Sequence, residues 1–173
     1  MAKARKKPAA NVPDATQHPG SAFMRRAIEL AREGVRSNQG GPFGAVIVKD
    51  GVVIGEGCNQ VLATNDPTAH AEIVAIRAAC AQLGTFKLEG CELYTSCEPC
   101  PMCLAAAYWA RLRSVHYACE RTDAARAGFD DSFLYDEFAR APAERKLALE
   151  SMMRDEGLSA FEAWMDKADR TPY

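Results

Sequence analysis

The sequence predicts an α/β protein, a three-layer α/β/α sandwich built on a central mixed sheet of about five strands. Stretches with the apolar spacing of helices alternate with short runs typical of β-strands, as in such folds. The dipeptide Asp50-Gly51 joins two of these runs and predicts an antiparallel hairpin. The later strands are separated by helices, which favours parallel pairing between them. At 173 residues the chain is long enough for one domain with a substantial core.

The first half of the chain is expected to hold two helices and a hairpin. Ser21 can cap the first helix, and the run Gly40-Gly41-Pro42 ends it. A loop then precedes the second helix. In order, the expected elements are a helix from Ser21 to Gly40, strands over 43–48 and 52–57, a loop over 59–66 and a helix from His70 to Gly84.

The second half continues the alternation, but the pattern weakens after residue 119. In order, the expected elements are a strand over 91–97, a helix from Cys100 to about Leu112, a strand over 114–119, a polar segment over 122–131, a short helix over 132–140, a strand over 146–153 and an amphipathic helix over 158–168. Leu147, Leu149 and Met152 give the 146–153 segment its strand-like pattern. The apolar side chains after residue 119 need a surface to cover, which a neighbouring subunit could provide.

Two short motifs carry the candidate chemistry, a His-x-Glu beginning at His70 and a Pro-Cys-x-x-Cys beginning at Pro99. Zinc binds histidine nitrogen and cysteine sulfur tetrahedrally, and three protein ligands leave a fourth position open for water. Zinc lowers the pKa of such a water to about 7, and a neighbouring carboxylate can then carry protons. We therefore expect His70, Cys100 and Cys103 to hold one zinc ion. Glu72 is the expected catalytic proton carrier.

Both motifs are expected at the N-termini of helices. Residues two apart on a helix point about 200° apart, so His70 and Glu72 cannot share a helix face. At a helix start, however, side chains lean toward the N-terminus and can converge beyond the helix end. Asp66-Pro67-Thr68 and the prolines at 99 and 101 are typical of such starts. The positive ends of the two helix dipoles would then favour thiolates on the cysteines.

Two other interpretations of the cysteines stay open at this point. Cys97 lies three residues before Cys100, so a closed structural zinc centre with three thiolates and one imidazole is possible. Such a centre would leave Glu72 without a role, and Cys97 is expected to end a strand outside the following helix. A lone Cys-x-x-Cys could also be redox-active, although nothing beside it indicates a thioredoxin-like strand order.

Composition favours a cytoplasmic protein with no membrane partner. No apolar run is long enough to span a membrane, and no hydrophobic segment follows the N-terminal basic residues. The seven cysteines are therefore expected as reduced thiols. Residues 1–20 are expected to form a disordered basic tail. Residues 21–173 carry a net charge of about −5, which suits a nucleic-acid backbone poorly, so no nucleic-acid partner is expected.

Beyond the two motifs, the chain resembles the cytidine/deoxycytidylate deaminase superfamily, and within it the small bacterial guanine deaminases. The zinc motif is specific only for the superfamily, whereas Gly-Phe-Asp-Asp and the C-terminal tyrosine indicate guanine. The resemblance covers about residues 40–173. The segments that carry it are Gly41-Pro42-Phe43-Gly44-Ala45, Asn65-Asp66-Pro67-Thr68-Ala69-His70-Ala71-Glu72, Tyr94-Thr95-Ser96-Cys97-Glu98-Pro99-Cys100, Tyr108-Trp109-Ala110-Arg111, Gly128-Phe129-Asp130-Asp131-Ser132 and Tyr173.

The resemblance implies a cytidine deaminase-like fold and a single zinc-dependent domain over 21–173. The implied activity is hydrolysis of a cyclic amidine C–N bond, namely deamination of guanine to xanthine and ammonia in purine catabolism or salvage. By the same resemblance, the two cysteines and His70 match the family's zinc ligands, and Glu72 matches its proton shuttle. The family also implies a homodimer with one zinc ion per subunit.

The resemblance also assigns residues that bind the purine. Asn59 matches an asparagine that hydrogen-bonds the base. Asp131 and the terminal Tyr173 resemble residues used near the substrate, supplied by a C-terminal segment, 120–173, that is exchanged between two subunits. Phe43, Trp109 or Phe129 could stack on the ring. The alternatives are structural, since Asn59 could cap a turn, Asp131 could cap the following helix, and the two later aromatic residues could serve a core or an interface.

Three rival functions stay open from the sequence. The first is deamination of another purine-like substrate, such as guanosine or an aminotriazine, although a ribose needs room that a closed C-terminal segment can deny. The second is a tRNA adenosine deaminase, which would need a basic surface around its pocket. The third is a non-catalytic zinc-binding module, in which Glu72 would be dispensable and metal removal would unfold the chain.

Overall fold

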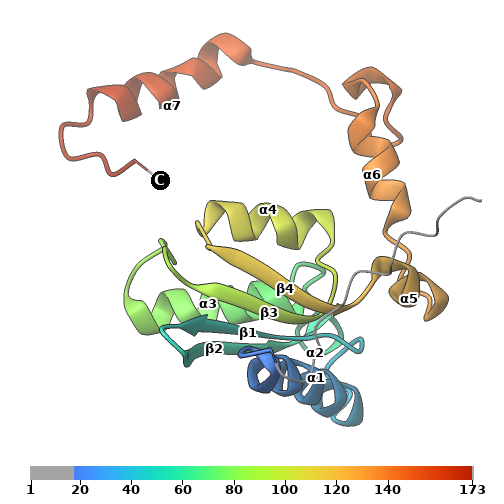
Figure 1. The fold of residues 1–173 in the computed structure, drawn as a ribbon. Helices are drawn as coiled ribbons and strands as arrows, with labels where there is room; N and C mark the ends of the chain where they lie inside the picture. The colour runs from blue at the N-terminus through green and yellow to red at the C-terminus, as the bar shows by residue number, and fades with distance from the viewer. Residues whose placement is uncertain (1–17, 173) are drawn as a thin grey trace, which may run out of the picture.

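A four-stranded mixed sheet forms the centre of the protein in the computed structural model, which describes residues 18–172 (Figure 1). The strands are β1 (Gly44–Lys49), β2 (Val52–Cys58), β3 (Glu92–Cys97) and β4 (Ser114–Cys119). They lie in the order β2-β1-β3-β4. Strand β1 is antiparallel to β2 and β3, whereas β3 and β4 are parallel. The predicted mixed sheet and the parallel pairing of its later strands are confirmed.

The turn between β1 and β2 confirms the predicted hairpin. Asp50 and Gly51 both have positive φ angles, 49° and 77°. Two successive residues in this conformation form the type of turn whose twist matches that of an antiparallel pair. Glycine adopts it without steric cost and aspartate tolerates it better than most residues.

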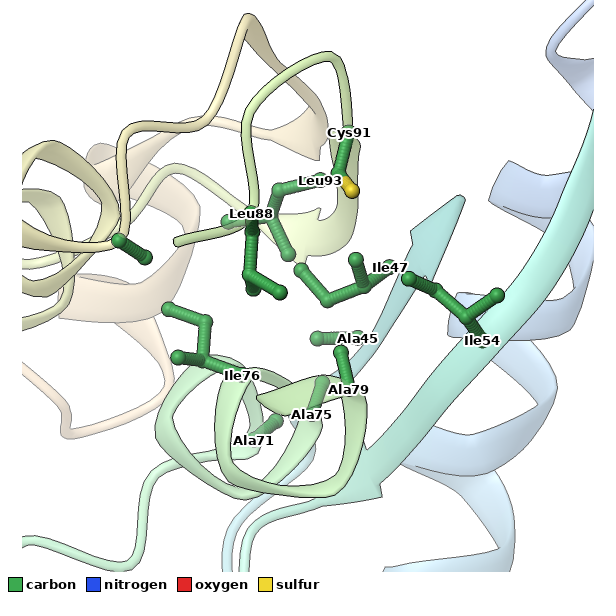
Figure 2. Close-up of a cluster of buried hydrophobic side chains, with 11 residues drawn as sticks. Ala45, Ile47, Ile54, Ala71, Ala75, Ile76, Ala79, Leu88, Cys91 and Leu93 are labelled. Carbon is green, nitrogen blue, oxygen red and sulfur yellow. The ribbon is translucent and has the colours of Figure 1, made fainter. Parts of the chain in front are cut away.

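Helices cover both faces of the sheet and complete the three layers. Helix α1 (Ser21–Arg36) lies on one face, where Leu30 packs against Val46, Val48 and Tyr94. Helix α3 (Ala71–Leu83) covers the other face, and α4 (Pro101–Trp109) follows β3 on that side. Figure 2 shows this second layer of the core. Its buried side chains are Ala45, Ile47, Ile54, Ala71, Ala75, Ile76, Ala79, Leu88, Cys91, Leu93 and Ala110.

Small residues bring α3 very close to β2. The helix presents Ala71, Ala75 and Ala79, spaced four apart and therefore on one face. The strand presents Gly55 and Gly57, and a Cβ added at either would lie 2.5 Å from a backbone oxygen of α3. Only glycine therefore fits there. The close approach fixes the N-terminus of α3, from which the His-x-Glu motif emerges, against one end of the sheet.

A bidentate ion pair connects α1 to β2. Arg26 donates from Nε and Nη2 to the two carboxylate oxygens of Glu56, at 2.9 and 2.8 Å. Glu29 and Glu33 on the same helix also lie within 3.4 Å of Arg26 Nη1. The hydrogen bond from Arg26 lowers the pKa of Glu56. This geometry is the favourable one for an arginine–carboxylate pair.

The start of α1 differs from the prediction. Gly20, rather than Ser21, occupies the N-cap position, and Ser21 is the first helical residue. A Cβ at Gly20 would lie 2.4 Å from the Tyr94 ring, so close packing against this strand residue excludes any larger side chain at position 20. The Gly20 N–H donates to His18 Nδ1 at 3.0 Å. Residues 18–20, expected in the disordered tail, therefore form an ordered turn, and residues 1–17 lie outside the described chain.

The chain after β4 runs away from the sheet as a helical arm (Figure 1). Its elements are α5 (Arg121–Arg126), α6 (Ser132–Ala139), the 3-10 helix η2 (Pro142–Glu144) and α7 (Arg154–Asp166). The predicted fifth strand over 146–153 is wrong, and the sheet has four strands. Within residues 18–172 this segment pairs with no strand, and its residues lie exposed between η2 and α7. A short helix, α2 (Val61–Thr64), also forms inside the predicted loop.

Candidate active site

The two motifs meet because both lie at helix starts, as predicted. His70 is the N-cap residue of α3, and Cys100 is the N-cap residue of α4. The Nδ1 atom of His70 lies 3.5 Å from the Sγ atoms of both Cys100 and Cys103. All three donor atoms lie within 4.8 Å of one another. Three potential metal ligands from two helices therefore surround one point.

These donors fit one Zn²⁺ ion. Tetrahedral ligands at zinc distances of about 2.0 to 2.3 Å lie about 3.5 Å from each other, as the nitrogen and sulfur atoms do here. Cys97 is not a member of this group, and its thiol donates to the backbone oxygen of Glu120 at 3.6 Å. Among the described residues, the closed centre with a third thiolate is therefore not formed. Three protein ligands correspond to an open, catalytic type of zinc site.

The pKa values of the two cysteine thiols are shifted in opposite directions. The hydrogen bond from Cys103 lowers the pKa of Cys100 to about 4, and the neighbouring His70 also favours the thiolate. The same hydrogen bond and burial raise the pKa of Cys103. Zinc binds cysteine as thiolate, so metal binding would displace a proton from Cys103.

Glu72 lies beside the metal ligands and is almost completely buried, with 5 % of its surface exposed. Its Oε1 atom accepts a hydrogen bond from Thr95 Oγ1 at 3.1 Å, and its Oε2 atom accepts one from Cys103 Sγ at 3.4 Å. Burial raises the pKa of Glu72. A raised pKa makes a carboxylate a better proton acceptor, and a carboxyl group can both accept and return a proton.

A cavity of about 400 Å³ opens onto this group. His70, Glu72 and Cys100 line it on one side, and Phe43 and Phe129 line it on another. The two rings pack edge to face, with centroids 5.0 Å apart and an interplanar angle of 86°. A pocket with apolar aromatic walls and a few converging polar groups is typical of a small-molecule site.

Asn59, 6 % exposed, contributes a fixed polar group to the cavity. Its Oδ1 atom accepts hydrogen bonds from the backbone N–H groups of Gly41 and Val61, both at 3.2 Å. Backbone N–H groups can only donate, so the amide orientation follows from these two contacts. The Asn59 NH₂ group is then the part available to a ligand. The residue both caps a turn and can present a donor to a substrate.

The remaining predicted residues lie at different distances from the cavity. Asp131 is the N-cap residue of α6, but its side chain makes no cap hydrogen bond, and Asp130 accepts from the Ser132 N–H instead. Burial and the charge of Cys100 raise the pKa of Asp131, but Asp131 is not among the residues that line the cavity. Trp109 is 69 % exposed on α4 and is not among the residues that line the cavity. Tyr173 lies outside the described residues.

Sequence reasoning did not identify two residues that shape this site. Thr95 bonds Glu72 from β3, and its signal was a hydroxyl between Leu93 and Cys97 in an otherwise apolar alternation. The second residue is Gly40, which the sequence pattern indicates only as a helix breaker. A Cβ there would lie 2.1 Å from Asn59 Oδ1, so glycine is required for the Asn59 contact.

The fold and the site together define the class of protein. The chain belongs to the cytidine and deoxycytidylate deaminase family, because residues 18–119 match the family's zinc-binding region. It is 57 % identical to the guanine deaminase of Bacillus subtilis over 151 residues, which cover 87 % of this chain and 97 % of that protein. The resemblance found in the sequence is thereby confirmed.

Two further comparisons give the range of this similarity. The X-ray structure of guanine deaminase from Bacillus subtilis superposes with a TM-score of 0.85 at 56 % identity, over 88 % of this chain and 97 % of that one. The cytidine deaminase-like fold is confirmed. The tRNA-specific adenosine deaminase of Agrobacterium fabrum is 45 % identical, but over 98 residues that cover 57 % of this chain and 64 % of that protein.

Proposed function

We propose that this chain is a zinc-dependent hydrolase that deaminates guanine to xanthine and ammonia. The observation that carries the proposal is the extent of its similarity to the Bacillus subtilis guanine deaminase. The 151 aligned residues reach past residue 119, beyond the zinc-binding region common to the family. The match to the Agrobacterium fabrum tRNA-specific enzyme is confined to 98 residues. Part of the helical arm therefore lies within the similarity to the guanine enzyme.

The chemistry of the reaction follows from the three metal ligands and Glu72. Zinc held by His70 and the two cysteines would supply a Lewis acid that lowers the pKa of a water molecule. A Cys103 thiolate cannot donate, so loss of its proton frees Glu72 Oε2. Glu72 would take one proton from the attacking water and give it to the adjacent ring nitrogen. It would then take the second proton of that water, from the hydroxyl now on the ring carbon, and give it to the amine, so that ammonia leaves as the C–N bond breaks and the carbonyl forms.

The cavity supports binding of a flat, polar base. Phe43 offers an apolar ring surface, and the Asn59 NH₂ group offers a donor to a ring nitrogen or carbonyl oxygen. We assign Asp131 the complementary role, because an ionised carboxylate accepts hydrogen bonds from purine N–H or amine groups. Tyr173 is proposed as a further contact at the substrate, on the basis of the family resemblance alone.

We further infer a homodimer in which the arm, residues 120–173, covers the partner subunit. The arm carries large apolar side chains that are more than a third exposed, and in Figure 1 α7 stands away from its own sheet. Exposed apolar area of this extent is typical of a protein interface. The side chains are Phe133, Phe138, Leu147, Leu149, Met152, Met153, Leu158, Phe161, Trp164 and Met165. We place the enzyme in the cytoplasm, where its seven cysteines would stay reduced.

One assay tests the proposed substrate against its rivals. Purified, zinc-loaded protein is incubated with guanine, guanosine, adenine, cytosine and a tRNA anticodon hairpin, and released ammonia is measured. We expect release from guanine at a rate far above that from the other four. Ammonia from the hairpin alone would overturn the substrate assignment. No turnover of any substrate, with Glu72→Gln unchanged in metal content and stability, would indicate a non-catalytic zinc module. None of the helices within residues 18–172 is long and apolar enough to cross a bilayer.

A further inference from the structure

We infer that Thr95 is a positioning residue, whose hydroxyl holds one oxygen of Glu72 so that the other faces the metal ligands. The inference rests on the proposed function, because it concerns the residue that would carry protons in that reaction. It is carried by the buried contact between Thr95 Oγ1 and Glu72 Oε1, at 3.1 Å.

Thr95 is held rigidly in space. It lies on β3, an inner strand of the sheet, opposite Ala45 of β1 and Tyr117 of β4. Its exposed fraction is 0 %. A β-branched side chain has few χ1 rotamers open to it, so a fixed backbone also fixes the direction of the hydroxyl. Thr95 is therefore suited to hold another group in place.

The hydroxyl is unusual for its surroundings. Along β3 the side chains alternate between the two faces of the sheet, and Thr95 shares a face with Leu93, which packs in the apolar layer beneath α3. Valine has nearly the same shape and would need no hydrogen-bond partner there. A buried hydroxyl is unfavourable unless it is hydrogen-bonded, and the structure pairs this one with Glu72. Packing alone does not explain a threonine at this position.

This contact gives the two carboxylate oxygens of Glu72 different partners. Oε1 is held by Thr95 on the side of the sheet, and Oε2 faces Cys103 Sγ at 3.4 Å on the side of the metal ligands. The terminal torsion of a glutamate is broad, so an unrestrained carboxylate can turn about its axis. Because the carboxylate is planar, fixing Oε1 also fixes Oε2. Thr95 thereby keeps a proton-accepting oxygen directed at the reacting atoms.

Three variants separate positioning from packing. Thr95→Val keeps the shape and removes the hydroxyl, whereas Thr95→Ser keeps the hydroxyl and removes the methyl group. Ser96→Ala is the matched control. Ser96 is the next residue on the same strand, points to the opposite face, and its buried Oγ accepts from the Gly44 N–H at 3.0 Å. For each purified, zinc-loaded variant, kcat and KM for guanine, zinc per chain and Tm are measured.

We expect Thr95→Val to lower kcat roughly 10- to 100-fold, because misplaced catalytic groups cost rates of this order. Its KM and zinc content should stay close to the wild-type values. Thr95→Ser should restore kcat to within about threefold of wild type while lowering Tm, since it rebuilds the hydrogen bond and leaves a small void. Ser96→Ala should lower Tm and leave kcat unchanged. If Thr95→Val does not fold, Thr95→Ala replaces it with the same expected loss of kcat.

A double-mutant cycle tests whether the loss of kcat in Thr95→Val depends on Glu72. In a Glu72→Gln background, Thr95→Val should cause less than about a twofold further loss, because the oxygen it positions no longer carries protons. The inference is overturned if Thr95→Val keeps the wild-type kcat, or if Thr95→Ser loses as much kcat as Thr95→Val. An inactive wild-type protein would instead overturn the proposed function, so the two failures are distinguishable.

Discussion

The Oδ1 atom of Asn59 lies 3.2 Å from the backbone nitrogen of Gly41, and this contact fixes which end of the amide faces the cavity. A second backbone donor, the N–H of Val61, reaches the same oxygen at the same distance. The contacts are possible because Gly40 has no Cβ to obstruct the oxygen. A turn in the chain thus determines that the Asn59 NH₂ donor is the end of the amide available in the cavity.

The Asn59→Asp variant tests this orientation. One aspartate oxygen can keep both backbone contacts, while the other replaces the NH₂ donor with an acceptor. We expect KM for guanine to rise at least about tenfold, which corresponds to the loss of about one hydrogen bond. Asn38→Asp, an exposed site with the same chemical change, serves as the control. A wild-type KM in Asn59→Asp would show that the amide does not contact the substrate.

Replacing Glu72 by glutamine separates metal binding from proton transfer. The variant keeps the shape of the side chain and can still accept from Thr95, so the zinc site should stay intact. An amide cannot carry the proton, and we expect kcat to fall by roughly 10² to 10⁴. Zinc per chain is measured by atomic absorption, and kcat by ammonia release. Substantial activity with normal zinc content would assign the proton carrier to another group.

The three zinc ligands can be distinguished from the neighbouring cysteine. Cys100→Ala should lose both the metal and the activity, because a chelating thiolate is removed. Cys97→Ala is the matched comparison, three residues earlier and outside the ligand group. We expect it to keep one zinc per chain after dialysis against a moderate chelator. Zinc loss from Cys97→Ala equal to that from Cys100→Ala would show that Cys97 is a ligand.

The Arg26–Glu56 pair predicts a specific pH dependence of stability. Arg26 lowers the pKa of Glu56 below its ordinary 4.5, so the folded state favours the ionised carboxylate. The pair therefore stabilises the protein at pH values above 4.5, the ordinary pKa of glutamate. This contribution is lost as the pH falls through the lowered pKa of Glu56. Both side chains are about a third exposed, so solvent screens the pair. We expect Glu56→Gln to lower the free energy of unfolding by about 0.5 to 1 kcal/mol at pH 7.

Urea unfolding of both proteins at pH 7 and pH 4 measures this difference. The difference should be smaller at pH 4, which lies below the ordinary pKa of 4.5, because the unfolded chain then binds a proton at Glu56 that the folded state disfavours. It should also be smaller in high salt. Asp155→Asn, an exposed carboxylate on α7, provides a control in which little change is expected. A difference that stays constant between the two pH values would contradict the assignment.

The proposed exchange of the arm between subunits predicts that two defective chains can complement each other. Chains lacking residues 168–173 should keep their zinc but show a raised KM or a lowered kcat, because the proposed Tyr173 contact is lost. Mixed with Glu72→Gln chains, they can form a dimer in which an intact arm reaches a site with an intact Glu72. We expect activity to return on mixing, measured after partial unfolding and refolding of the pair. Mixtures no more active than their separate components would contradict the exchange, and wild-type kinetics in the shortened chain would remove Tyr173 from the site.

Local signals in the sequence predicted the parts of this fold that local physics determines. Asp50-Gly51 predicted the hairpin, because a tight turn requires residues that tolerate positive φ. The helix starts at His70 and Cys100 were predicted from the prolines and polar residues around them, and their convergence followed from helix geometry. The zinc ligands could be named for the same reason.

Features that depend on distant neighbours could not be predicted in this way. The alternation over 146–153 predicted a strand, but a strand needs a partner, and none of the residues that the structure describes provides one there. Ser21 is a good cap residue, yet contact between Gly20 and the Tyr94 ring decided where α1 begins. Thr95 and Glu72 are 23 residues apart, so their hydrogen bond exists only once the sheet and α3 are assembled.

The coordination of zinc tests the central claim most directly. X-ray absorption at the zinc edge is measured on wild-type protein that holds one zinc per chain. The structure predicts two sulfur ligands at about 2.3 Å, with one nitrogen and one oxygen ligand at about 2.0 to 2.2 Å. The oxygen would be a solvent molecule beside Glu72, at the open position of the site. Three sulfur ligands and no oxygen would mean that Cys97 closes the centre, and the enzyme proposed above would have no place to bind its water.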